Sequence, residues 1–213
     1  MEKNSDYAKK LLNKEEGYWV DLEIESVYKD KEGRPVADKI RMKKQTYGDQ
    51  QIILTDEMAY LENKDEAVVV VHSFNTIFWI QEAPEKQSMK LLALRDTVSQ
   101  DYFEHAFPIS SKQIVVDGES LFELTVGLKN DYKKKSGISH INYVLDYENK
   151  KMKSVEIIYQ KDLNLISQKK TIYQEARGKE FKIQENIRAM VLSKSGKPLG
   201  EYRGMNVEII ANK

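Results

Sequence analysis

Short stretches in which apolar and polar residues alternate dominate the sequence, and they predict a mainly β fold. Val20, Leu22 and Ile24 alternate with acidic residues, which is the spacing of a strand with one buried face. The turn composition of residues 29–35, with Gly33 able to adopt a positive φ, predicts a hairpin into a returning strand at 36–42. Further strands are predicted at 51–55, 57–61, 67–72, 76–80, 113–116, 121–128, 141–147, 152–159, 163–173, 181–183 and 207–210.

Two stretches have helical periodicity instead. A short helix is predicted from a cap at Asn4 or Ser5 to Leu12, because its apolar residues recur at positions i, i+3 and i+4. A longer helix is predicted from Glu85 to about Phe103, where a broad apolar stripe runs until Phe107-Pro108 ends the pattern. Residues 130–137 are highly charged and predict a loop, whereas residues 186–192 fit either a strand or a helical turn.

The absence of a repeat or a Pro/Gly-rich linker predicts that residues 1–213 form a single domain. The 34 basic and 34 acidic side chains give zero net charge, which argues against a general nucleic-acid binder. No apolar run approaches the roughly 20 residues that a membrane-spanning helix needs. The polar N-terminus does not resemble a signal peptide, so we expect either a cytoplasmic chain or one whose targeting segment, or lipid-anchoring cysteine, has been removed.

Catalytic and cofactor motifs are absent from the sequence. The chain has no cysteine, which excludes disulfides, Cys-ligated metals and Cys nucleophiles. His72, His105 and His140 are widely spaced, and none belongs to a metal-binding motif. The stretch 195–200 contains glycines and a lysine, but without a following Ser or Thr it predicts a β-turn rather than a phosphate-binding loop. We therefore predict a non-enzymatic protein with no cofactor and no metal.

The aromatic residues allow two interpretations. Trp19, Phe78 and Trp79 lie on predicted strands, and Tyr102 and Phe103 lie on the predicted central helix. Plain core packing is the simpler explanation. The alternative is a curved sheet with an apolar concave face that binds an acyl chain or another apolar ligand.

The order of elements resembles the LolA/LolB family of lipoprotein carriers and sorting proteins from Gram-negative envelopes. The segments that carry the resemblance are Tyr7–Leu12, Trp19–Tyr28, Asp30–Gly33, Lys39–Lys44 and Ile52–Ile80. They match a short helix, a polar-alternating strand, an acid/glycine hairpin, a basic strand and two hairpins. The resemblance implies a hydrophobic-ligand scaffold in the periplasm or at the outer membrane, with the helix at 85–103 as a lid.

Family carriers hold this lid with a strand arginine, for which Arg41 is the nearby candidate. The strand continues as Lys43-Lys44-Gln45, without the Arg-Pro of the carriers. By alternation, Arg41 is expected on the face opposite Val36, Ile40 and Met42, as a solvated cation.

The expected fold is an open antiparallel β half-barrel, covered on its concave face by the N-terminal and central helices. The expected function is to hold a lipid or a lipoprotein acyl chain, as a periplasmic or outer-membrane-associated protein. The predicted cavity lining is Trp19, Leu22, Ile24, Phe78, Ile80, Leu92, Val98, Phe103, Tyr143 and Leu145. The alternative is a structural or interaction subunit of an envelope assembly, with a filled core and a protein partner. An enzyme with a dispersed site ranks last, and a cleft holding acids or histidines with strongly shifted pKa values would favour it.

Overall fold

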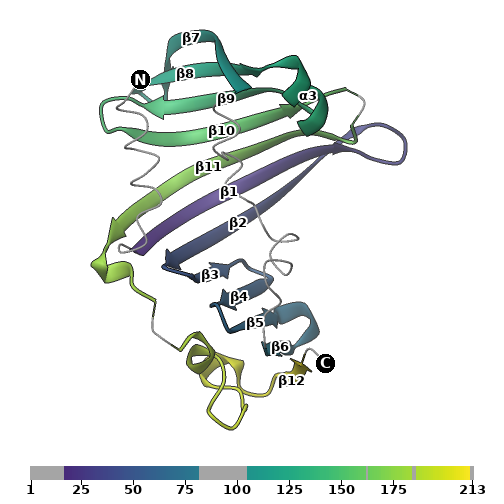
Figure 1. The fold of residues 1–213 in the computed structure, drawn as a ribbon, viewed down its shortest axis with the longest axis vertical. Coiled ribbons are helices and arrows are strands. Elements are labelled where there is room, and N and C mark those ends of the chain that lie inside the picture. Colours follow the sequence, from purple (N-terminus) through teal and green to yellow (C-terminus); the bar gives the residue numbers. More distant parts are fainter. Residues whose placement is uncertain (1–16, 82–104, 162, 184–185, 212–213) are drawn as a thin grey trace. The chain divides into compact units, whose positions relative to one another are not determined.

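A computed structural model of the 213-residue chain describes residues 17–81, 105–161, 163–183 and 186–211. Its strands form one open sheet of twelve in the order β12-β6-β5-β4-β3-β2-β1-β11-β10-β9-β8-β7 (Figure 1). The strands are β1 (Gly17–Lys29), β2 (Pro35–Tyr47), β3 (Gln50–Leu54), β4 (Met58–Glu62), β5 (Glu66–Val71), β6 (Thr76–Gln81), β7 (Ala106–Val116), β8 (Glu119–Leu128), β9 (Ile138–Asp146), β10 (Lys151–Tyr159), β11 (Leu165–Gly178) and β12 (Asn206–Ala211). The prediction of a mainly β fold is confirmed. The sheet is mixed rather than purely antiparallel, because β12 runs parallel to β6.

The chain divides into two compact units. Unit 1 comprises Met1–Asp21, Met42–Met89 and Gln174–Lys213, and unit 2 comprises Leu22–Arg41 and Lys90–Tyr173. Strands β1, β2 and β11 each contribute residues to both units.

Unit 1 has a core on one face of strands β3 to β6. Val68, Val70 and Ile77 have no exposed surface, and Ile187 and Val191 from the C-terminal segment pack into the same cluster. The C-terminal segment contains three short 3₁₀ helices, η3 (Lys179–Phe181), η4 (Ile187–Met190) and η5 (Gly200–Tyr202). A fourth 3₁₀ helix, η1 (His72–Phe74), joins β5 to β6. Unit 1 therefore buries this sheet face with its own downstream chain.

Unit 2 is built from β7 to β10, β11 up to Tyr173 and the adjoining parts of β1 and β2. Its buried cluster consists of Leu128, Ile138, Ile141 and Ile157. Helix α3 (Asn130–Ser136) connects β8 to β9 (Figure 1). Its Tyr132 packs against this cluster.

Helix α3 was not predicted from the sequence. The predicted N-terminal and central helices fall at residues 4–12 and 85–103, outside the described residues. The loop predicted at 130–137 is wrong, since α3 occupies it. Asp131 in its first turn and Lys133 to Lys135 in its last complement the helix dipole, and Gly137 ends it in the left-handed conformation, with φ 71°.

Three further segments revise the sequence predictions. The strand predicted at 181–183 is wrong, because η3 ends at Phe181 and extended chain follows without pairing in a strand. The ambiguous segment 186–192 contains η4, which begins where the Asn186 side chain accepts a hydrogen bond from the Ala189 N–H at 3.1 Å. Strand β7 begins at Ala106 rather than at 113, because an edge strand can accommodate Pro108.

Candidate hydrophobic-ligand face

Three rows of apolar side chains cross β8, β9 and β10 on one face of unit 2. Cross-strand partners in an antiparallel sheet project to the same face, so the register defines each row. The rows are Phe122–Leu145–Met152, Leu124–Tyr143–Val155 and Val126–Ile141–Ile157. The third row is buried, whereas all six side chains of the first two rows are half-buried. We call these three rows the apolar face of unit 2.

The apolar face continues onto β1. Gln168 of β11 is the cross-strand partner of Ile157, and its amide donates a hydrogen bond to the Ser26 hydroxyl at 3.3 Å. Ser26 therefore projects to the apolar face, and strand alternation places Leu22 and Ile24 beside it. Leu22 and Ile24 are both buried, with 4% and 5% of their surface exposed.

Strand β11 adds polar groups to this otherwise apolar surface. Lys170 is the cross-strand partner of Val155 and Gln168 that of Ile157, so both project to the apolar face. Lys170 is half-buried. A cationic side chain among aliphatic and aromatic neighbours is the group that would orient an anionic end of an apolar ligand.

The opposite face of unit 2 is polar. The Lys112 ammonium lies 2.9 Å from the Glu123 carboxylate, and the Thr125 hydroxyl donates to Asn142 Oδ1 at 3.0 Å. On β2, Lys39 lies 3.7 Å from Glu23 and 3.6 Å from Glu25. These contacts are typical of a solvated surface, so the two faces of the same strands differ sharply in chemistry.

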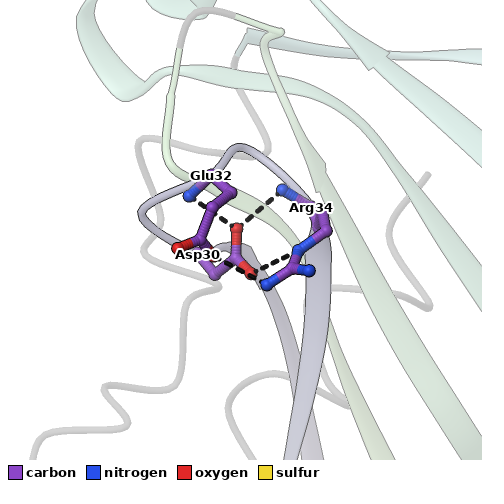
Figure 2. A network of polar contacts seen from close by, with 3 residues as sticks. All are labelled: Asp30, Glu32 and Arg34. Carbon is purple, nitrogen blue, oxygen red and sulfur yellow. Dashed lines mark hydrogen bonds and ion pairs between the residues drawn. The ribbon is translucent and has the colours of Figure 1, made fainter.

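The hairpin between β1 and β2 holds the strand that carries Leu22 and Ile24. Figure 2 shows that the Asp30 carboxylate accepts hydrogen bonds from the backbone N–H groups of Glu32 and Arg34, at 2.9 and 2.8 Å, and from Arg34 Nε at 2.9 Å. Arg34 also contacts Glu32 at 2.7 Å. The Arg34 backbone donor, followed by the side-chain donors, lowers the pKa of Asp30 below its usual value.

The turn between β9 and β10 holds Leu145, the central member of the first row, near the end of β9. The Asp146 carboxylate accepts from the Asn149 backbone N–H and from its side-chain amide, both at 2.9 Å. The Asn149 backbone donor is the largest cause of the lowered pKa of Asp146. Lys153 lies 2.6 Å from Glu119 and 4.0 Å from Asp146, and its hydrogen bond to Glu119 raises the pKa of Lys153.

Four of the ten predicted lining residues project to one sheet face, on strands β1 and β9, which β11 and β10 separate. Leu22, Ile24, Tyr143 and Leu145 all project to the apolar face of unit 2. Their alternation was the signal that selected them.

Two other predicted lining residues, Phe78 and Ile80, lie side by side in unit 1. Their cross-strand partners on β5 are Val69 and Ala67, so they occupy the sheet face opposite the buried Ile77. They are therefore not part of the apolar face of unit 2.

Trp19 does not lie with Leu22 and Ile24. Its position in β1 is of opposite parity, and its ring stacks on Phe181 with the centroids 6.5 Å apart. Gly17 allows this approach, because a Cβ at that position would collide with the Phe181 backbone. The remaining predicted lining residues, Leu92, Val98 and Phe103, lie outside the described residues.

The sequence analysis omitted several members of the face. Phe122, Leu124 and Val126 alternate with Glu123 and Thr125, and this signal alone could have added them. Val155 and Ile157 alternate with Glu156 in the same way.

Arg41 projects to the polar face, as alternation predicts. Its guanidinium carbon lies 4.5 Å from the centre of the Tyr173 ring, in a cation–π contact. Of the three residues predicted on the opposite face of the strand, Met42 is buried, but Val36 and Ile40 are 38% and 48% exposed. The reason is that β3 pairs with β2 only from Lys43 to Tyr47 among the described residues.

The three histidines lie on different elements of the described structure. His72 belongs to η1, His105 stacks on Tyr132 with the ring centroids 5.0 Å apart, and His140 contacts the Ser139 hydroxyl at 3.2 Å. Among the described residues, no group of three or more His, Asp or Glu could hold a metal ion. None of the helices within the described ranges is long and apolar enough to cross a membrane.

The segment at 195–200 forms the predicted turn. The Ser193 carbonyl accepts from the Gly196 N–H at 3.0 Å, and Gly196 has a φ of 76°. The Lys197 N–H donates to the Ser193 hydroxyl at 3.0 Å, so this turn is closed by its own side chain.

The sequence matches no family model and no curated protein. Among solved structures, an uncharacterized conserved protein from Thermus thermophilus is 5% identical, with a TM-score of 0.43 over 95% of this chain and 99% of its own. A domain named for outer membrane lipoprotein sorting, from Vibrio parahaemolyticus, is 12% identical, with a TM-score of 0.33 over 85% and 94%. A DUF1329 family protein from Desulfovibrio piger is 11% identical, with a TM-score of 0.34 over 80% and 89%. With every TM-score below 0.5, these structures assign neither a family nor a function to the chain.

Proposed function

We propose that this chain is a non-enzymatic cell-envelope protein that binds the acyl chain of a lipid or lipoprotein on the apolar face of unit 2. The observation that carries the proposal is the contrast between the two faces of β8, β9 and β10. One face presents three apolar rows, and the other presents charged and amide side chains. The sequence resemblance to lipoprotein carriers supports the envelope location.

The half-buried rows are suited to a flexible apolar chain. Six partly exposed side chains in two adjacent rows retain apolar surface that a ligand can cover, and burial of such surface contributes about 25 cal/mol per Å². Cross-strand neighbours lie roughly 5 Å apart, so an acyl chain that follows a row contacts all three strands.

Two adjacent residues of β9 provide a matched test. Leu145 projects to the apolar face, whereas Val144 pairs with Glu123 and Ser154 on the polar face. We expect Leu145→Lys to weaken binding of a fluorescent sixteen-carbon fatty acid by about tenfold or more, because an unpaired ammonium at the contact is poorly solvated. Val144→Lys should leave the affinity unchanged, because its ammonium lies beside Glu123.

The measurement is a fluorescence titration of the full chain with each variant, with folding checked by circular dichroism. Native mass spectrometry and lipid extraction of the purified wild-type protein would identify a ligand carried from the cell. Equal weakening by the two substitutions, or no binding of the fatty acid by the folded wild type, would contradict the proposed site.

Lys170 offers a test of ligand orientation. If its ammonium contacts the anionic end of the ligand, Lys170→Met should weaken binding of a fatty acid more than binding of its methyl ester. The expected difference is about tenfold, as for one charge-assisted hydrogen bond. Identical losses for the acid and the ester would remove Lys170 from the site without affecting the role of the apolar rows.

A second candidate function is that of an interaction subunit of an envelope assembly. The observation that favours it is strand β7, which ends the sheet and exposes apolar side chains. Purified protein that binds no fatty acid but associates through this strand would support the second function over the first.

A further inference from the structure

Strand β7 is a long edge strand with an apolar surface. It is 11 residues long, pairs with β8 and ends the strand order of the sheet (Figure 1). Within the described part of the chain, no strand pairs with its outer side. Phe107, Ile109, Val115 and Val116 are 46%, 57%, 74% and 43% exposed. An edge of this length and composition is a template for pairing with another strand.

The usual protection against such pairing is weak on β7. Charged side chains on an edge strand discourage association, and the exposed half of β2 carries three of them in Asp38, Lys39 and Arg41. The only charged residue of β7 is Lys112, and its ammonium lies 2.9 Å from Glu123 on β8. Pro108 removes one backbone donor and a β-bulge lies between Pro108 and Ser110, but both lie in the first half of the strand, and the pairing from Ser110 to Val116 is regular.

The hydropathy of β7 is symmetric about its centre. Residues 106–109 are apolar, residues 110–113 are polar, and residues 114–116 are apolar again. Two antiparallel copies centred on Ser111 would place residues 106–108 against residues 114–116 and polar residues together at the centre, with Ile109 the one apolar residue that faces a polar one, Gln113. Lys112 would then face Ser110 of the second copy rather than another lysine, and a two-fold interface requires this self-complementarity.

We propose that two copies of this chain associate through antiparallel pairing of their β7 strands about Ser111. The zero net charge of the chain means that two copies do not repel each other strongly. The pairing would satisfy the outward backbone groups of both edges and cover the exposed side chains of β7. It does not depend on occupancy of the apolar face of unit 2.

Sedimentation equilibrium of the full chain tests the association. We expect the mass to approach that of two chains as the concentration rises into the micromolar range. Val115→Lys should raise the dissociation constant about tenfold or more, because it places charge on the paired edge. Val36→Lys, at an exposed position of β2, is the matched control and should leave the dimer unchanged.

A cysteine substitution tests the register. Because the chain contains no cysteine, a Ser111→Cys variant can form a disulfide only between copies. Directly opposed residues of an antiparallel pair lie roughly 4.5–5.5 Å apart at Cα, which suits a disulfide. Oxidation should therefore yield a covalent dimer, whereas Ala37→Cys on β2 should yield little.

Two results would overturn the association. One is a wild-type chain that remains monomeric at every concentration, and the other is a dimer that Val115→Lys does not weaken. A dimer that Val115→Lys weakens, without cross-linking of Ser111→Cys, would overturn the register about Ser111.

Discussion

The core face of unit 1 and the apolar face of unit 2 arise from the same alternation of side chains but have different surroundings. In unit 1, Val68, Val70 and Ile77 are fully buried beneath a segment that includes Ile187 and Val191. In unit 2, the rows that contain Tyr143 and Leu145 are only half-buried. A face closed by its own chain functions as a core, whereas a face that retains exposed apolar surface is the one on which we propose that a ligand binds.

The difference in burial predicts a difference in stability. Ile187→Ala should lower the free energy of unfolding by about 2–5 kcal/mol, because a fully buried side chain leaves a cavity. Leu145→Ala should lower it by roughly 1 kcal/mol, because a half-buried side chain loses only part of its transfer free energy. Chemical denaturation of both variants measures the difference. Equal losses would show that the first row of unit 2 is packed as tightly as the unit 1 core.

The segment that closes unit 1 depends on its helix cap. Asn186→Ala removes the acceptor for the Ala189 N–H and should lower the free energy of unfolding by about 1 kcal/mol. Denaturation curves measure the loss, and the exposed Lys194→Ala is the control, with an expected change near zero. A loss comparable to that of Ile187→Ala would mean that the cap alone holds the segment on the sheet.

Strand alternation predicted most of the sheet because its period of two is a local property of the sequence. All twelve strands overlap the predicted stretches, β7 only over residues 113–116. The start of β7 was not predicted, because its first residues do not alternate. Phe107-Pro108 was assigned as the end of a helix, although it begins the edge strand β7, where a missing backbone donor is tolerated.

Only part of the candidate site could be predicted, because the odd or even position of a residue in a strand identifies the face that it occupies but not what covers that face. Leu22, Ile24, Tyr143 and Leu145 share a face, as their spacing suggested. Trp19 was grouped with them as an apolar residue of the same strand, although its odd position places it on the other face, where it stacks on Phe181. Whether an apolar face is covered depends on distant chain segments, such as 187–192 in unit 1, and local periodicity carries no information about them.

The turn between β9 and β10, beside Leu145, should make a small, pH-dependent contribution to stability. Hydrogen bonds from Asn149 lower the pKa of Asp146 below the unfolded value of about 3.9. The stabilisation is therefore fully present above that unfolded value and is lost as the pH falls through the folded pKa. Asp146→Asn retains an acceptor but removes the charge, so the wild-type advantage in melting temperature at pH 7 should shrink toward pH 2. The exposed substitution Glu148→Gln is the control, and its difference from wild type should not follow this trend. A gap between wild type and Asp146→Asn that stays constant over this range would show that the ionised carboxylate does not stabilise the turn beside Leu145.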